Sequence, residues 1–418
     1  MKTRPLWDVL RSRDEFGAGE LPLLTVVSSF GVGLRDTSEG RAPSEDLSGY
    51  RVVRQGDLVV NKLWARFGAY GVSRNEGIIS PAYWVLRIDR SKAVPGFLHH
   101  LLRSAPYRAE IWRRSKDMPP NGFDIPWSQF RTIAVPLPGL EEQGAIADFL
   151  DRECDRISRL SERLTEMSAL ADAGCRERIR AELVGAGPVV RLRRVIRSIG
   201  DGPFGSSLAS KHYVDSPGVR VIRLGNVGEA EFLAGDSAYI STEYFEDVLG
   251  DFRVSPGDVV VAGLGDAGHP LARACVVPDD LGLAIHKADC YRVRVDPRLV
   301  LPHYLAIALS FGLSRDEAPL MSRGATRARL NTTVARDLPV ALPSLSRQTA
   351  ILKSISDMRQ VTRQMRDRAA DLVISLAEYR DALITEAVTG QLDVVKATED
   401  QIQERLHAAS EGRLEEVA

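Results

Sequence analysis

Residues 137–146 read LPGLEEQGAI, and residues 342–351 read LPSLSRQTAI. At a constant offset of 205 positions, the second stretch repeats the first at Leu137, Pro138, Leu140, Gln143, Ala145 and Ile146. A block that recurs at about half the chain length indicates a duplicated unit. The sequence therefore predicts two copies of one fold, related by pseudo-two-fold symmetry.

Upstream of each block, short apolar runs alternate with Gly, Pro, Asp and Ser. The runs are LPLLTVV, GDLVVN and AYWVLRI in the first half, and VRVIRL, DVVVAG and YRVRV in the second. Such runs between turn-forming residues are typical of strands. GDLVV at 56–60 closely resembles GDVVV at the corresponding place, 257–261. We therefore expect the same order of strands in both mixed segments.

Downstream of each block lies a long stretch without proline, 141–184 in the first copy and 346–389 in the second. Each stretch stops at a glycine, Gly185 or Gly390, which is the usual residue just past the end of a helix. Apolar residues in these stretches recur every seven positions, which is typical of paired helices. The expected pairing seam consists of Ile146, Leu150, Ile157, Leu160, Leu164, Met167, Ile351, Ile355, Met358, Met365, Leu372, Leu376, Tyr379 and Leu383. The alternative is two independent amphipathic helices, each lying on its own domain.

Composition places the chain among ordinary globular proteins. It has 418 residues, of which 44% are hydrophobic and 27% charged, and 55 Lys+Arg against 56 Asp+Glu give a net charge of -1. This balance excludes a protein that coats nucleic acid by charge alone, but not a local basic surface. Four scattered cysteines favour a reducing compartment. No run approaches 18 apolar residues and the first residues lack the apolar core of a signal peptide, so we expect a cytoplasmic protein.

The chain resembles the specificity (S) subunits of type I restriction-modification systems. The resemblance rests on LPGLEEQGAIADFLD with its long helix, the echo LPSLSRQTAI, and the closing ALITEAVTGQLDV. DGPFGSSLASKHY with VIRLGNV, and GVSRNEGIISPAYWVLR, resemble the variable domains of that family. The similarity extends over the whole chain up to Val395, and the combination of the two blocks is its most specific part. One departure is Ser346-Arg347, which stands where the first copy has Glu141-Glu142.

The resemblance implies an α/β (mixed α+β) fold with two tandem target recognition domains. Each domain is followed by a long helix, and the helices pair as a coiled-coil spacer. The expected ranges are 1–138 for the first domain, 139–187 for the first helix, 188–343 for the second domain, 344–395 for the second helix, and 396–418 for an acidic tail.

The resemblance also implies a function without catalysis. Each domain reads one half of a bipartite sequence in double-stranded DNA, and the helices dock two methyltransferase subunits. A system of this kind can add two restriction subunits. The chain then needs no cofactor, because the partner subunits methylate adenine with S-adenosylmethionine or cleave DNA with ATP and Mg²⁺.

DNA contacts are expected where Arg, Lys and amide side chains gather in loops, since phosphate contacts need cations and base readout needs paired donors and acceptors. In the first domain the candidates are Arg54, Asn61, Lys62, Arg66, Arg113, Arg114 and Lys116. In the second domain they are Lys211, Arg223, Asn226, Lys287, Arg323, Arg327 and Arg329. Each of these residues could equally be an ordinary solvated side chain.

Other motifs carry less weight. Gly263–Gly268 matches a dinucleotide fingerprint, but Pro270 and the strand-like LARACVV follow where that motif needs a helix. Cys275, His286 and Cys290 could supply zinc ligands, yet the sequence has no Cys-x-x-Cys pair. Adenine-methyltransferase tetrapeptides and a phosphate-binding Gly-Lys-Ser/Thr are also missing from the sequence.

Two other functions remain open at this point. A standalone methyltransferase or nuclease is disfavoured by the missing motifs. A duplicated coiled-coil adaptor, or a DNA-binding protein that works without methyltransferase partners, fits the repeat as well. Methylation by the chain with and without a partner distinguishes these possibilities.

Overall fold

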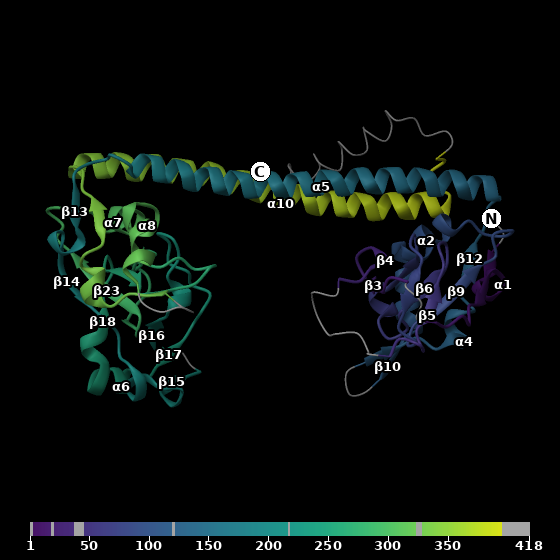
Figure 1. The fold of residues 1–418 in the computed structure, drawn as a ribbon, viewed down its shortest axis with the longest axis horizontal. Coiled ribbons are helices and arrows are strands. Elements are labelled where there is room, and N and C mark those ends of the chain that lie inside the picture. The colour runs from purple at the N-terminus through teal and green to yellow at the C-terminus, as the bar shows by residue number, and fades with distance from the viewer. Residues whose placement is uncertain are drawn as a thin grey trace. The chain divides into compact units, whose positions relative to one another are not determined.

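The computed structural model describes residues 3–17, 21–36, 46–118, 122–215, 218–322 and 328–394. The chain divides into two compact units (Figure 1). Unit 1 comprises Met1–Glu166 and Arg368–Ala418, and unit 2 comprises Met167–Asp367. Each unit therefore contains one mixed domain together with parts of both long helices.

The first domain is built from short strands and helices in unit 1. Its strands are β1 (Thr3–Pro5), β2 (Leu10–Ser12), β3 (Leu24–Val27), β4 (Gly31–Leu34), β5 (Arg51–Val53), β6 (Leu58–Val60), β7 (Tyr70–Val72), β8 (Gly77–Ile79), β9 (Trp84–Ile88), β10 (Lys116–Met118), β11 (Gly122–Asp124) and β12 (Ala134–Pro136). Its helices are α1 (Leu6–Val9), η1 (Ala65–Phe67), α2 (Pro95–Arg103), α3 (Ala105–Arg114) and α4 (Trp127–Phe130).

The second domain has more elements. Its strands are β13 (Val189–Arg191), β14 (Ile196–Gly200), β15 (Tyr213–Val214), β16 (Val219–Ile222), β17 (Tyr239–Ile240), β18 (Arg253–Val254), β19 (Val259–Ala262), β20 (Leu264–Gly265), β21 (Ala274–Val276), β22 (Ala284–His286), β23 (Cys290–Val295), β24 (Ala328–Arg329) and β25 (Pro339–Ala341). Its helices are η2 (Leu192–Arg194), η3 (Gly205–Leu208), η4 (Ser210–His212), η5 (Leu224–Asn226), α6 (Thr242–Tyr244), η6 (Phe245–Leu249), η7 (Gly250–Phe252), α7 (Pro302–Phe311), α8 (Leu313–Met321) and α9 (Thr332–Ala335).

The two domains share one frame. The first domain has an antiparallel sheet of order β2-β9-β6-β7, and the second domain has an equivalent antiparallel sheet of order β14-β23-β19-β21. In each domain the first and last strands pair, β1 with β12 and β13 with β25. The six strands expected from the sequence are all present as β3, β6, β9, β16, β19 and β23. The second domain adds a five-stranded sheet, β15-β17-β16-β22-β18, in which β16 and β22 run parallel.

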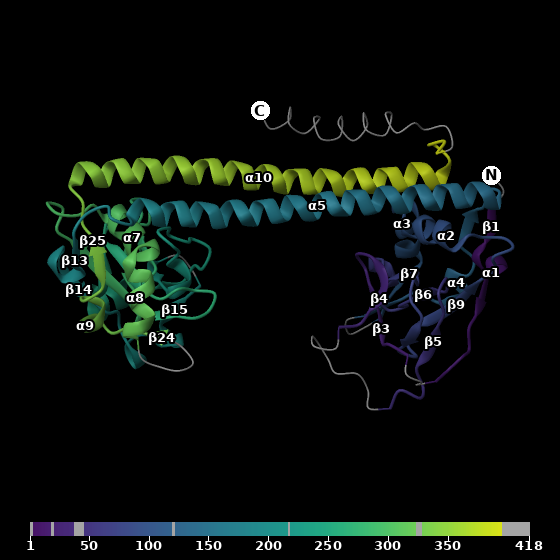
Figure 2. The same cartoon turned by 45° about the horizontal axis from the view of Figure 1, so that its top comes forward.

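The long helices are α5 (Leu140–Leu183) and α10 (Leu345–Thr389). They lie side by side in both views (Figures 1 and 2). In unit 1, Leu150 near the start of α5 and Leu383 near the end of α10 share one buried core with α2. In unit 2, Ile179 near the end of α5 and Ile351 near the start of α10 belong to one buried core. The helices are therefore antiparallel, and their ends complete the domain cores.

Burial along the expected seam varies with position. The buried members are Ile146, Leu150, Ile157, Ile351, Ile355 and Leu383, and the half-buried members are Leu160, Leu164, Met358, Leu372, Leu376 and Tyr379. Met167 and Met365 are 57% and 51% exposed, so these two do not belong to a buried seam. Both methionines lie near the middle of their helices, whereas every buried member except Ile157 belongs to a domain core near a helix end. Burial therefore depends on the domains that cover the helices, which the heptad spacing does not reveal.

A buried glutamine joins each domain to its helix. The Gln143 side chain on α5 hydrogen-bonds the backbone at Val94, Lys92 and Pro138. Gln348 on α10 bonds the backbone at the equivalent places in the second domain. The duplicated Leu-Pro-x-Leu-x-x-Gln block therefore encodes the joint between a domain and a helix.

Candidate nucleic-acid interface

One face of the first domain combines cations with exposed aromatic rings. We call it the first-domain surface, and it consists of Lys62, Trp64, Arg66, Phe67, Trp112, Arg113 and Lys116. The Arg66 guanidinium lies 3.6 Å from the centre of the Trp112 ring, a cation–π contact. Phe67 packs edge-on against Trp112, with ring centres 5.6 Å apart. The fold thus brings together two basic clusters that lie about 50 residues apart in the sequence.

Arg103, at the end of α2, holds the loops beside this surface. One of its terminal nitrogens donates to the carbonyls of Gly68 and Tyr70, and the other donates to those of Ser28 and Ser29, at 2.8–3.0 Å. Burial lowers the pKa of Arg103. The planar guanidinium suits this task because it presents several donors in a fixed geometry.

The remaining first-domain candidates are engaged within the protein. Arg54 forms ion pairs with Glu15 and Glu76, and Asn61 is only 8% exposed. Arg114 donates to Glu110 at 2.6 Å and also binds the Gln129 carbonyl and the Thr132 hydroxyl. These contacts make Arg54, Asn61 and Arg114 poor candidates for DNA recognition.

Arg113 also pairs with Glu110, at 2.9 Å, but its side chain is 70% exposed. It can therefore reach solvent from this pair. Arg113 remains a candidate on the first-domain surface.

The second domain presents a different face. We call it the second-domain surface, and it consists of Phe204, Lys211, Lys287 and Arg329. Arg329 donates to Asp289 at 2.8 Å, and its guanidinium lies 5.6 Å from the Phe204 ring centre. The Lys287 ammonium lies 5.7 Å from the ring centre of Tyr213. Lys211 is exposed on η4.

Asp201 ties the backbone beneath this surface. Its carboxylate accepts the backbone N–H groups of Gly202 and Asp289 at 2.8 and 2.9 Å. Burial raises the pKa of Asp201. These bonds bring the 200–206 segment next to the strand connection that carries Lys287.

Arg223 and Asn226 have structural contacts instead. Asn226 is fully buried; its oxygen accepts the Arg223 N–H at 2.9 Å, and its amide donates to the carbonyls of Leu233 and Asp236. The Arg223 side chain pairs with Asp236. Asn226 is therefore left out of the candidate interface, because no face of it reaches solvent. Arg323, Arg327 and the acidic tail 396–418 lie outside the described residues.

The glycine-rich segment Gly263–Gly268 is a strand connection. Strand β20 occupies Leu264–Gly265, and Asp266 then accepts the N–H groups of Gly268 and His269 in a turn. Arg273 lies under this turn, 4% exposed, and donates to the carbonyls of Val227, Leu224 and Pro270. No helix begins in the glycines, so the dinucleotide-binding motif lacks its essential element.

The buried cysteines and histidine of the second domain pack in its interior. Burial raises the pKa of the Cys275 thiol to about 12, and His286 bonds the Cys290 carbonyl through Nδ1 at 2.6 Å. Within the described ranges, no three His, Cys, Asp or Glu side chains form a group suited to a metal ion.

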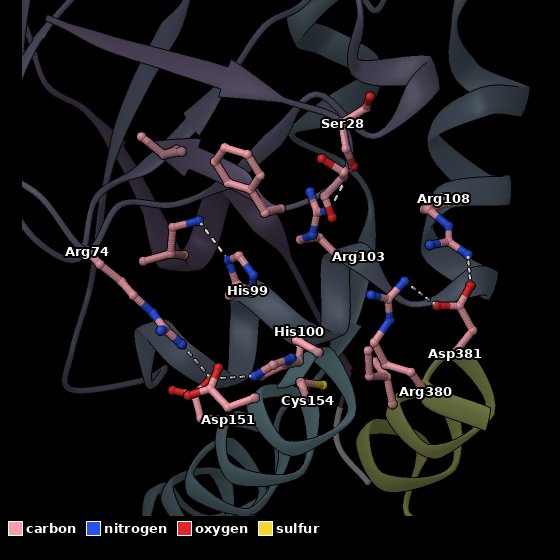
Figure 3. A pocket seen from close by; sticks show the side chains of 17 residues that line it. Ser28, Arg74, His99, His100, Arg103, Arg108, Asp151, Cys154, Arg380 and Asp381 are labelled. Atoms are coloured by element: carbon pink, nitrogen blue, oxygen red, sulfur yellow. Dashed lines mark hydrogen bonds and ion pairs between the residues drawn. The ribbon is translucent and has the colours of Figure 1, made fainter. Parts of the chain in front are cut away.

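In unit 1, a pocket of about 420 Å³ lies where α2 meets the start of α5 and the end of α10 (Figure 3). Asp151 binds His100 at 2.8 Å and Arg74 at 3.0 Å. The hydrogen bond from His100 is the main reason why the pKa of Asp151 is lowered. Arg108 pairs with Asp381 at 2.7 Å across the same joint. These paired charges fasten the helices to the domain.

The sequence reasoning missed Trp112, Phe204, Arg103 and Arg273. Trp112 and Phe204 had one available signal, since Trp112 stands directly before Arg113-Arg114 and Phe204 directly before Gly205. Arg103 and Arg273 had none, because binding to backbone carbonyls depends only on tertiary structure.

Comparisons with known proteins point in one direction. No family model matches the chain. It is 20% identical over 337 residues to the type I restriction enzyme StySPI specificity subunit of Salmonella potsdam. This alignment covers 78% of this chain and 69% of that relative.

Two solved structures have a similar fold. A chain from a study of complex assembly and conformational transition in a type I restriction-modification system superposes with a TM-score of 0.69 at 16% identity, covering 94% of this chain and 98% of that one. The HsdS subunit from Thermoanaerobacter tengcongensis gives 0.55 at 17% identity, with 94% and 97% covered. The sequence match confirms the resemblance to type I specificity subunits, and the two solved structures show the same fold.

Proposed function

We propose that this chain is the DNA specificity subunit of a type I restriction-modification complex. Each domain reads one half of a bipartite DNA sequence through the surface described above. The chain performs no chemistry itself, and it positions two methyltransferase subunits on the DNA. It binds no cofactor of its own.

One observation carries this proposal. The two domains share the same four-stranded sheet and the same joint to a long helix, yet their exposed surfaces differ. The joint is the same buried glutamine in both copies, Gln143 and Gln348. The first-domain surface has three aromatic rings with Lys and Arg, whereas the second-domain surface has one exposed ring. The two domains are therefore joined to their helices in the same way but carry different side chains on their surfaces. This arrangement suits the reading of two different half-sites, because direct readout depends on which side chains reach the bases.

The candidate contacts divide by chemistry. Lys62, Lys116, Lys211 and Lys287 are suited to phosphates, since an ammonium is a point charge. Arg66, Arg113 and Arg329 can contact phosphates or donate in pairs to guanine. The net charge of -1 predicts weak binding by the isolated chain, because phosphate neutralisation supplies much of the affinity.

Partner subunits complete the proposed complex. The methyltransferase subunits bring S-adenosylmethionine, and restriction subunits, where the system has them, bring ATP and Mg²⁺. In the described part of the chain, no helix has the length and apolar character needed to span a membrane. We place the complex in the cytoplasm, where DNA and these cofactors are found.

Methylation mapping tests the proposal. The chain is co-expressed with its methyltransferase partner in a host free of other adenine methylation, and methylated adenines are located by single-molecule sequencing. We expect one bipartite motif, methylated only when both proteins are present. Methylation by the chain alone, or loss of sequence preference, contradicts the proposal.

Single-residue variants then test the surfaces. Arg329→Ala and Lys287→Ala should weaken methylation at the mapped motif, while Arg298→Ala serves as a control at an 81% exposed side chain that pairs with Asp296. A base contact costs about 1–3 kcal/mol and relaxes one position of the motif, whereas a phosphate contact weakens all sequences alike. No effect from either surface variant would remove the second-domain surface from the interface.

A further inference from the structure

The connection between β6 and β7 displays large apolar side chains to solvent. Leu63 is 38% exposed and Trp64 is 56% exposed, and the neighbouring rings of Phe67 and Trp112 are 41% and 46% exposed. The Trp64 and Phe67 ring centres lie 5.5 Å apart. Exposed apolar groups clustered in this way mark an interaction site more often than a chance feature.

The connection is held rigidly. The Trp64 N–H donates to the Asn61 carbonyl at 3.0 Å, and the Trp64 carbonyl accepts from Phe67 and Ala69 at 2.9 and 3.2 Å. Arg103 binds the Gly68 carbonyl from below. A rigid loop loses little conformational freedom on binding, so the ring is presented in advance of its partner.

We call Leu63 and Trp64 the aromatic tip of this connection. The charged residues around the tip favour a polyanion as its partner. The segments 61–67 and 110–116, together with Asp124, hold five basic and two acidic residues. Lys62 immediately precedes the tip, and the Arg66 guanidinium covers one face of Trp112. Duplex DNA offers phosphates for such cations and stacked bases for the ring.

The second domain provides an internal comparison. The segment between its equivalent strands, β19 and β21, is GLGDAGHPLAR and contains no Trp, Phe or Tyr. In this segment Asp266 closes the turn by accepting the N–H groups of Gly268 and His269, and there is no indole ring to display. The aromatic tip therefore belongs to the first domain, and its effect should be confined to one half-site.

We propose that Leu63 and Trp64 form a wedge that enters duplex DNA at the first half-site and unstacks one base step. Lys62 and Arg66 hold the flanking phosphates, while the indole ring stacks on one of the two separated bases and leaves the other unstacked. This inference rests on the proposed function. It adds a local DNA distortion, made by this chain, to the reading of one half-site.

The test uses the complete complex with its methyltransferase partners on the mapped bipartite sequence. 2-Aminopurine is placed at each position of both half-sites in turn, because its fluorescence rises when stacking is lost. We expect a rise at one step of the first half-site besides the methylated adenines, and no equivalent rise in the second half-site. In Trp64→Ala this rise should vanish, and in Trp64→Phe it should largely persist.

Affinity for the same DNA gives a second measure. Loss of one aromatic stack should weaken binding by roughly 5- to 150-fold in Trp64→Ala. Trp7→Ala, which removes an indole ring that is 47% exposed elsewhere in the first domain, should bind as the parent does.

The outcomes separate the two proposals. If no bipartite sequence is methylated, both fail. If the motif is methylated but no Trp64-dependent fluorescence appears outside the methylated adenines, only the wedge is overturned. If Trp64→Ala instead prevents assembly with the methyltransferase, measured by gel filtration without DNA, the tip is a protein contact and the wedge is likewise overturned.

Discussion

Gln143 and Gln348 make the same set of hydrogen bonds in the two units. Each side-chain oxygen accepts a backbone N–H at 2.8 Å, from Val94 or Leu301. Each amide donates at 2.9 Å to a proline carbonyl of its own block, and to a second carbonyl from the segment before α2 or α7. Both side chains are fully buried. Among uncharged side chains, only an amide combines an accepting oxygen with an NH2 group that has two donors, as these three bonds require.

Replacing either glutamine should loosen its domain from its helix. Gln143→Met leaves the Val94 N–H and two carbonyls without their partner, at a cost of about 1–3 kcal/mol for each buried group that finds no other. Gln348→Met should cost a similar amount in unit 2. Hydrogen exchange at the start of α5 or α10, combined with urea denaturation, measures the change.

Two further variants sharpen this prediction. Gln143→Glu removes the donor and should destabilise unit 1 at least as much as Gln143→Met. Glu141→Gln, at an exposed position in the first turn of α5, removes only a favourable interaction with the helix dipole and should cost less, about 0.3–1 kcal/mol. Tolerance of both Gln143 variants would show that the joint does not depend on this side chain.

Arg273→Lys should impair the second domain while preserving its charge. A lysine has three donors on one nitrogen and cannot reach the carbonyls on both sides that the guanidinium fork binds. We expect faster hydrogen exchange at Leu224 and at the turn near Gly268, together with weaker reading of the second half-site. The first half-site should be unaffected, and Arg298→Lys is the matched control. Equal loss at both half-sites would indicate a global effect.

Exchange of the second domain should change one half-site only. The junctions Arg191 and Pro339 are direct partners in the β13–β25 register, so a graft of residues 191–339 enters and leaves at one paired position. Residues 1–136 and both long helices stay as they are. Methylation mapping of cells that carry a chimera with another family member should show one new half-site and one retained. If both half-sites change, the domains do not read independently.

Acid should destabilise the second domain through His286. Burial lowers the pKa of His286 from 6.5 to about 4. Between these values the unfolded chain binds a proton that the folded chain does not, so stability is complete above pH 6.5 and falls as the pH drops toward 4. The loss is about 1.4 kcal/mol per pH unit, or about 3 kcal/mol in total.

His286→Asn checks this assignment. Asparagine keeps a donor for the Cys290 carbonyl but does not titrate in this range. The free energy of unfolding of the variant, measured in urea between pH 7 and 4, should depend less steeply on pH than that of the parent. Parallel curves for the two proteins would assign the acid sensitivity to other groups.

The repeated frame could be read from the sequence because its signals are local. The strands are short apolar runs between turn residues, and α5 and α10 end just before Gly185 and Gly390, both of which have positive φ. The glutamine of the Leu-Pro block was visible as a repeated residue. Its role was not, because two of its three backbone partners lie about 50 positions away.

The binding surfaces were less predictable. Asn226 and Arg66 look alike in sequence, as polar residues in glycine-containing segments. Asn226 is buried within its own turn, while Arg66 stacks on Trp112 from a different helix. Such differences depend on which loops the fold brings together, and spacing along the chain does not contain that information.

The division of the helices between units has a consequence for synthesis on the ribosome. Unit 2 is one continuous segment, Met167–Asp367, whereas the core of unit 1 includes Leu383 and Val388 near the end of α10. At about 5–20 residues per second, roughly 10–40 s pass between emergence of the first part of unit 1 and of the residues that complete it. Unit 2 can therefore finish folding first, although the first domain is translated earlier. Throughout that interval the nascent first domain exposes the apolar surface that α10 later covers, and such a surface is prone to aggregation until α10 arrives.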